Sequence, residues 1–117
     1  MRKLRPNLKK ADDLFGKLIR LLYSECRKCG RTDELDVAHI LSRDIHQIRW
    51  SEENAFLLCR EHHRFYTDNP NAWRAFVKEE IGEWAYDNLK HRENKYLYLD
   101  YDEIYARLKG RIKDLQV

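Results

Sequence analysis

The sequence has no run of about 18 consecutive apolar residues, the length that a helix needs to cross the hydrocarbon core of a membrane. Its basic first residues, MRKLRPNLKK, are not followed by the apolar segment of a secretory signal. Internal repeats, low-complexity tracts and Gly/Ser linkers are also absent. We therefore expect no membrane-spanning helix and no export, and we predict a cytoplasmic location.

The absence of a linker within 117 residues predicts a single domain. Charged residues make up 37% of the chain and the mean hydropathy is −0.83, which indicates a well-solvated surface around a small core. A core of this size gains stability from a structural metal. We divide the domain 1–117 into a basic arm and first helix (1–25), a central core (26–68) and C-terminal helices (69–117).

The two ends of the chain differ in charge, although the overall net charge is only +3. Residues 1–31 carry a net charge of +7, whereas residues 32–117 carry −4. A basic N-terminal part is typical of a surface that faces phosphate groups. The alternative is that these lysines and arginines are simply solvated.

Three cysteines cannot all pair with one another, and their spacing favours a metal over a disulfide framework. Cys26 and Cys29 form a C-x-x-C pair, and about thirty residues later Cys59 and His62 form a C-x-x-H pair. Two intervening residues allow both side chains of a pair to reach one tetrahedral ion, and thiolates with an imidazole select zinc. Gly30 suits the tight turn that follows the first pair. The alternative is that Cys59 is an ordinary buried thiol.

Hydrophobic periodicity predicts an α+β, mainly helical domain with one small hairpin. Helices are expected at 8–23, 60–68, 72–91 and 103–115, and strands at 35–40 and 55–58. Asn71 and Asp102 are the expected N-caps of the last two helices. Residues 41–53 form a long polar connection of the kind that is usually functional, and residues 95–100 could be a short extended segment. Gly16 lies inside the first helix at a cost of about 1 kcal/mol relative to alanine.

The central segment carries a further set of residues in a characteristic order. They are Val37-Ala38-His39-Ile40, then Asn54, and then Leu58-Cys59-x-x-His62-His63. This order resembles the HNH endonuclease motif of the ββα-metal fold, and residues 38–54 more narrowly resemble phage recombination nucleases of the NinG type. The resemblance covers about residues 26–90. It implies a ββα-metal (HNH) core with a structural zinc knuckle and flanking helices, in a bacterial or phage-infected cell.

The same resemblance implies a metal-dependent DNA endonuclease that hydrolyses phosphodiester bonds. Hydrolysis needs a general base to take a proton from water and a cation at the scissile phosphate. His39 would be the base, since imidazole titrates near neutral pH. Asn54 would orient the loop that holds His39, and His63 would bind catalytic Mg²⁺ or Mn²⁺. Adjacent residues of a helix point about 100° apart, so His62 can face the zinc while His63 faces the second ion.

Ala38 departs from the family pattern, because many members carry an Asp, Glu or His at this position as a ligand of the catalytic metal. The candidate replacements are His39 itself, Asp36, His46, Asp44 and water. A site with few carboxylates should bind Mg²⁺ poorly and favour Mn²⁺, Co²⁺ or Ni²⁺.

Basic residues beside the zinc ligands and in the 41–53 connection are candidates for contacts with the DNA backbone. They are Arg27, Lys28, Arg43, Arg49, Arg60 and Arg64. Salt bridges to Asp44 or Glu52 are the alternative for Arg43 and Arg49. No separate recognition helix rich in Arg, Asn and Gln is apparent, so we expect structure-directed or weakly sequence-specific cutting. The helices at 72–91 and 103–115 are candidates for a homodimer interface.

Two other functions fit the same sequence. The first is a non-catalytic, zinc-stabilised nucleic-acid-binding module that lost the reaction because of Ala38. The second is an adaptor that binds a partner through its acidic C-terminal half. DNA cleavage in a divalent ion distinguishes the nuclease from the module, and salt-dependent DNA binding distinguishes both from the adaptor.

Overall fold

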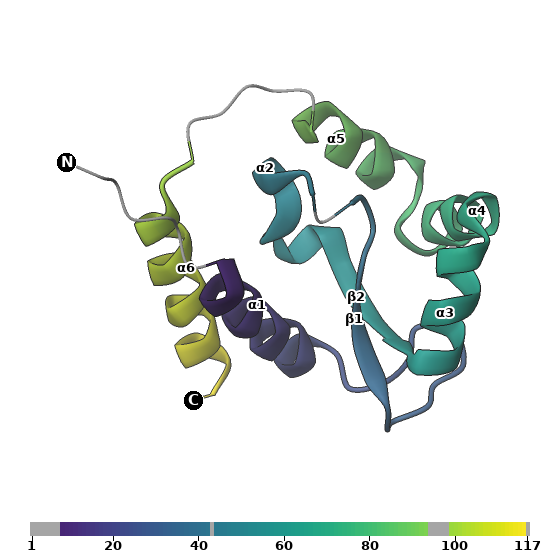
Figure 1. Cartoon of the computed structure of the whole chain (residues 1–117), viewed down its shortest axis with the longest axis horizontal. Coiled ribbons are helices and arrows are strands. Elements are labelled where there is room, and N and C mark those ends of the chain that lie inside the picture. Colours follow the sequence, from purple (N-terminus) through teal and green to yellow (C-terminus); the bar gives the residue numbers. More distant parts are fainter. Residues whose placement is uncertain (1–7, 43, 94–98, 117) are drawn as a thin grey trace.

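A computed structural model describes residues 8–42, 44–93 and 99–116 and places a two-stranded antiparallel sheet between two groups of helices (Figure 1). The strands are β1 (Leu35–His39) and β2 (Ala55–Cys59). On one side lie α1 (Leu8–Leu22) and α6 (Tyr101–Leu115). On the other side lie α3 (Arg60–Asp68), α4 (Pro70–Ile81) and α5 (Glu83–Glu93). The predicted α+β, mainly helical class is therefore confirmed.

The strand β2 is the centre of the core, because all five of its residues are buried. Successive side chains of a strand point to opposite faces. Phe56 and Leu58 pack into a cluster with residues of α3, α4 and α5. Ala55 and Leu57 pack into a second cluster with residues of α1 and α6. The continuous apolar run in β2 thus follows from burial on both faces.

The long connection between the strands is structured rather than open. It contains α2 (His46–Arg49) and a 3-10 turn, η1 (Glu52–Asn54). Trp50, between them, is buried, and its indole Nε1 donates a hydrogen bond of 3.0 Å to Asp12 of α1. This hydrogen bond anchors the connection to the first helix.

The predicted helix over 72–91 is wrong, because the chain forms two helices there. Gly82 separates α4 from α5 with a φ of +88°, a conformation that only glycine adopts at no steric cost. The break also moves Trp84 out of the predicted apolar face, since its side chain is 80% exposed. The helix α4 starts earlier than predicted, with Pro70 in its first turn after Asn69 as N-cap, so Asn71 is not the cap.

The last helix also starts earlier than predicted. Asp100, and not Asp102, is its N-cap, and the Asp100 carboxylate accepts hydrogen bonds from the backbone N–H groups of Asp102 and Glu103. The predicted extended segment at 95–100 lies largely outside the described residues, which leave out 94–98. Within the described ranges, no helix has both the length and the apolar content that crossing a membrane requires.

Candidate active site and metal centre

Three cysteines and a histidine from the two predicted pairs lie close together at the end of the hairpin. The ligand atoms of Cys26, Cys29, Cys59 and His62 are all within 4.8 Å of one another. The Sγ atoms of Cys29 and Cys59 are 3.9 Å apart, and His62 Nδ1 is 3.2 Å from Cys59 Sγ and 3.9 Å from Cys26 Sγ. Zn–S bonds of about 2.3 Å in a regular tetrahedron would place sulfurs about 3.8 Å apart. The arrangement is therefore compatible with a structural zinc site.

Backbone hydrogen bonds hold the first pair of this cluster against the hairpin. Gly30 donates to the Cys26 carbonyl at 2.9 Å and has a φ of +79°, which confirms the tight turn. Arg27 donates to the carbonyl of Leu57 in β2 at 2.9 Å. The second pair lies where β2 passes directly into α3, with Cys59 as the N-cap residue. Both pairs are thus fixed by secondary structure.

Two thiols of the cluster have shifted pKa values. Burial raises the pKa of Cys26, but hydrogen bonds from the backbone of Cys59, Cys29 and Lys28 outweigh it and lower the pKa to about 6. Burial raises the pKa of Cys59, and the neighbouring Cys29 and Cys26 side chains raise it further. A cation among these sulfurs would relieve the repulsion between thiolates, as expected of a metal site.

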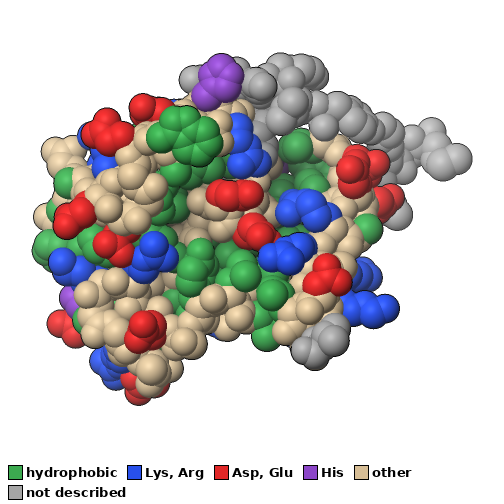
Figure 2. Space-filling model, turned by 180° about the vertical axis from the view of Figure 1, so that it is seen from behind, with side chains coloured by type: hydrophobic (Ala, Val, Ile, Leu, Met, Phe, Trp, Pro, Cys, Tyr) green, Lys and Arg blue, Asp and Glu red, His purple; other side chains and the backbone are tan. Residues whose placement is uncertain are grey.

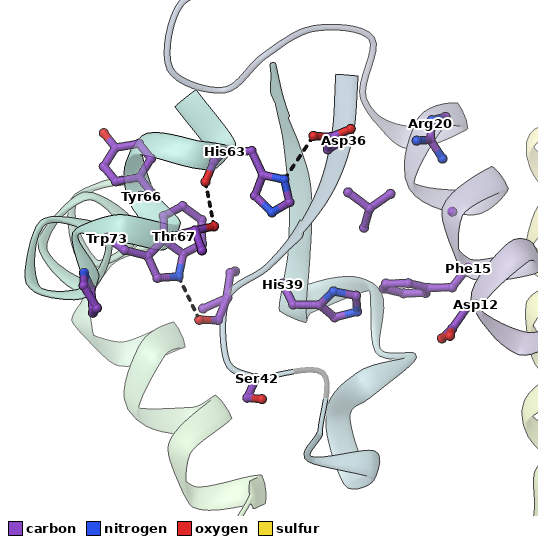
Figure 3. A pocket seen from close by; sticks show the side chains of 14 residues that line it. Asp12, Phe15, Arg20, Asp36, His39, Ser42, His63, Tyr66, Thr67 and Trp73 are labelled. Carbon is purple, nitrogen blue, oxygen red and sulfur yellow. Dashed lines mark hydrogen bonds and ion pairs between the residues drawn. The ribbon is translucent and has the colours of Figure 1, made fainter. Parts of the chain in front are cut away.

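A cleft of about 860 Å³ lies between α1, β1 and the α3–α4 corner (Figure 3). Its wall includes His39 and Asp36 from β1 and His63 from α3, which the sequence singled out. It also includes Asp12 and Arg20 of α1, which the sequence analysis did not identify as site residues. Neither residue belongs to a recognisable sequence motif. They line the cleft because α1 packs beside β1.

His39 is held at the end of β1 with one ring nitrogen committed. Its Nε2 lies 3.0 Å from the backbone carbonyl of Arg49, which can only accept a hydrogen bond. Because the carbonyl only accepts, this contact requires a proton on Nε2. The ring also packs against Phe15 of α1, with ring centroids 5.4 Å apart. These two contacts fix the position and the orientation of the imidazole.

Asn54 is fully buried and fastens the loop that follows His39. Its side-chain oxygen accepts a hydrogen bond from Leu41 N at 2.9 Å, and its amide nitrogen donates to Leu41 O at 3.3 Å. The Asn54 carbonyl accepts a third bond from Ile40 N at 2.8 Å. The chain beyond β1 is thus tied to the start of β2.

His63 projects from α3 toward the cleft and is oriented by Asp36. His63 Nδ1 lies 3.1 Å from Asp36 Oδ2, and the two side chains are 38% and 29% exposed. A carboxylate accepts, so Nδ1 is the donor in this contact, and in the neutral ring the lone pair is on Nε2. A carboxylate behind a histidine in this way is typical of metal-binding imidazoles.

Ala38 is buried and offers no ligand atom. Together with His39 and His63 it lines a small pocket of about 80 Å³ beside the main cleft. His46, a candidate replacement ligand, lines a different pocket, where its Nδ1 lies 3.2 Å from the Tyr101 hydroxyl. Asp44 lies in an exposed turn. Among the described residues, Asp36 is therefore the candidate carboxylate nearest to His63.

The basic residues predicted to contact DNA differ from one another in exposure and in their partners. Arg49 is buried, and its guanidinium makes two hydrogen bonds to the Asp12 carboxylate, at 2.6 and 3.0 Å. It therefore cannot serve as a surface contact, and its partner is neither Asp44 nor Glu52. Arg27 pairs with Glu80 at 2.8 Å.

Lys28 lies over the Phe76 ring, 5.3 Å from its centroid. Arg60 and Arg64 are exposed on α3, and Arg43 lies outside the described residues. Figure 2 shows basic and acidic side chains interspersed on the back of the molecule.

No family model, curated protein or solved structure matches this chain.

Proposed function

We propose that this protein is a zinc-stabilised, metal-dependent DNA endonuclease with an HNH-type active site. The observation that carries the proposal is that His39, His63 and Asp36 line one cleft. Hydrogen bonds orient both imidazoles there. A base and a metal ligand held in one cleft are what phosphodiester hydrolysis requires.

The structural ion would be held by Cys26, Cys29, Cys59 and His62. Three sulfurs and one nitrogen complete a tetrahedral shell and leave no position for substrate. This site would therefore fasten the Cys26–Gly30 turn to the start of α3, while the chemistry takes place in the cleft.

His39 would take the proton of the attacking water on Nδ1. The water oxygen forms the new bond to phosphorus as the ester P–O bond on the opposite side breaks, and the departing oxygen gains a proton from solvent. The Arg49 carbonyl holds the tautomer during this step and stabilises the positive charge on the protonated ring. Asn54 acts as a positioning residue, because it holds Leu41 and so the end of β1.

His63 would bind the catalytic Mg²⁺ or Mn²⁺ through Nε2, with Asp36 holding its Nδ1–H. The bound cation would neutralise charge that develops on the phosphate. Ala38 gives no ligand, so water and phosphate oxygens would fill most of the coordination shell. We therefore expect activity in Mn²⁺ to exceed activity in Mg²⁺, and equal activity in the two ions at sub-millimolar concentration would contradict this part of the proposal.

The deciding experiment is nicking of supercoiled plasmid in Mn²⁺. We expect the wild type to convert plasmid to open circles and His39→Ala to lose at least a hundredfold in rate, as removal of a general base typically does. His91→Ala is the matched control, because His91 is exposed on α5 away from the cleft residues, and it should cut like the wild type. Equal cutting by His39→Ala would reject the proposed base.

A non-catalytic nucleic-acid-binding module is the second candidate, and buried Ala38 is the observation that favours it. It predicts salt-dependent DNA binding without cleavage in Mg²⁺, Mn²⁺, Co²⁺ or Ni²⁺. DNA as the substrate, structure-directed or weakly specific cutting, a homodimer and action in the bacterial or phage-infected cytoplasm are further parts of the proposal that rest on the sequence resemblance.

A further inference from the structure

Arg20 is on the α1 side of the cleft, across from His63 and Asp36 (Figure 3). Among the described residues that line this cleft, it is the only lysine or arginine. Its side chain is exposed, so a ligand in the cleft can reach it. The cleft therefore has one cationic group on the wall opposite the proposed metal ligand.

The Arg20 guanidinium is positioned by the hairpin. Its Nη2 donates a hydrogen bond of 3.2 Å to the carbonyl of Leu35, the first residue of β1. This bond uses part of a planar group whose N–H donors form a rigid fork. The donors that remain match the oxygens of a phosphate, which arginine binds through paired hydrogen bonds.

Gly16 provides the space for this guanidinium. A Cβ atom at Gly16 would lie 2.9 Å from Arg20 Nη1, closer than real Cβ atoms approach other atoms. The backbone of Gly16 is ordinary α-helix, so no unusual φ requires glycine at this position. Glycine destabilises a helix interior relative to alanine. An alanine at this position would require the Arg20 guanidinium, the end of a flexible side chain, to shift from its present place.

The acidic residues of the cleft have partners of their own. Asp12 accepts hydrogen bonds from Arg49 and Trp50, and Asp36 accepts one from His63. None of these hydrogen bonds, all between described residues, involves Arg20, whose Nη2 donates to the neutral carbonyl of Leu35. The Arg20 guanidinium thus lines the cleft with its described hydrogen bond going to a backbone carbonyl.

We propose that Arg20, seated against Gly16, binds a phosphodiester group of nucleic acid in the cleft. The proposal deepens the proposed nuclease function and rests on it. Arg20 would then contact the substrate on the side opposite His63, and the strand would lie between α1 and α3.

The first test compares two glycine-to-alanine changes in helices. Gly16→Ala would displace the guanidinium, whereas Gly110→Ala in α6 meets nothing within 4 Å. Both should keep or raise the melting temperature, because alanine favours the helix. We expect Gly16→Ala, which requires the Arg20 guanidinium to shift, to lower plasmid nicking, and Gly110→Ala to leave it unchanged. Wild-type nicking by a folded Gly16→Ala would overturn the proposal.

The second test removes the charge directly. Arg20→Ala should lower plasmid nicking at least tenfold and weaken binding to a fluorescein-labelled DNA duplex, with a shallower salt dependence. Lys17→Ala is the matched control, since Lys17 is exposed on the same helix and does not line the cleft. Arg20→Lys, which keeps the charge, should recover part of the loss. Equal losses in the Arg20 and Lys17 variants would overturn the proposal, because they would indicate only a general charge effect.

The two measurements separate failure of this inference from failure of the nuclease. If the wild type binds the duplex but does not cut plasmid in any divalent ion, the nuclease function fails. Arg20 is then judged by binding alone, against Lys17→Ala. If the wild type neither binds nor cuts, both proposals are wrong.

Discussion

The four residues of the cysteine cluster and the three proposed site residues of the cleft, Asp36, His39 and His63, come from the same stretch of chain, residues 26–63. The two sets differ in how completely they could surround an ion. In the cluster, four ligand atoms lie within 4.8 Å of one another, and Cys26 and Cys59 are buried. In the cleft, His63 and Asp36 are paired but remain 38% and 29% exposed. A complete tetrahedral set suits a structural role, whereas open coordination positions suit a site that must admit substrate.

Removal of zinc should have the largest effect. Zinc binding contributes about 10–16 kcal/mol to the folding of small zinc domains, more than the stability of a typical domain. We therefore expect a strong chelator to abolish the near-UV circular dichroism and the cooperative thermal transition, while the same chelator saturated with zinc does neither. Full stability after verified zinc removal would show that the cluster is not a structural metal site.

Substitution of the adjacent histidines separates the two sites most sharply. His62→Ala removes a cluster ligand and should greatly lower the melting temperature. His63→Ala removes a partly exposed side chain, so we expect it to keep the fold and lose Mn²⁺-dependent nicking. Circular dichroism and plasmid nicking on both variants check this prediction. Equal destabilisation by the two substitutions would mean that the sites are not independent.

Asn54→Ala should have an intermediate effect. It leaves the partly buried N–H and C=O groups of Leu41 without their side-chain partner, at a cost of about 2 kcal/mol in the free energy of unfolding. Urea denaturation measures this loss. Asn88→Ala on the exposed side of α5 is the control and should change the free energy by less than about 0.5 kcal/mol. A similarly small change for Asn54→Ala would indicate that other contacts hold the loop.

Asp36→Asn should have the smallest effect. The fold should persist, but the His63 ring would lose its charged acceptor, and the Mn²⁺ concentration for half-maximal nicking should rise about tenfold. Asp87→Asn, an exposed change on α5, is the control. An unchanged Mn²⁺ requirement would show that Asp36 does not support the metal ligand.

The sequence predicted those parts of the molecule that depend on short-range spacing. The four cluster residues follow from two local pairs, and the hairpin and α3 follow from short apolar runs with clear limits. The polar connection around Arg49 predicts a contact with the DNA backbone. In the structure Arg49 instead binds Asp12, which is 37 positions away in α1. A contact of this kind depends on packing between elements, and no local pattern indicates it.

The glycines also show that local sequence patterns do not determine where a helix ends. Gly16 and Gly110 lie within continuous helices, whereas Gly82 ends α4. All three occur within helical hydrophobic periodicity, so the periodicity alone could not tell them apart. Gly82 ends a helix through its positive φ, whereas Gly16 lies within a helix beside the Arg20 side chain. Both differences depend on tertiary structure.

The cluster has a topological consequence for how the protein could change. Cys29 and Cys59 are 30 positions apart, so an ion between them would close the intervening chain into a ring. This ring contains Asp36, His39 and Asn54, and His63 lies just outside it. Arg20 and the rest of α1 lie outside the ring altogether. Variation in α1 would reshape one wall of the cleft without opening the ring. Under the proposed function, substrate preference could therefore diverge while Asp36 and His39 keep their places.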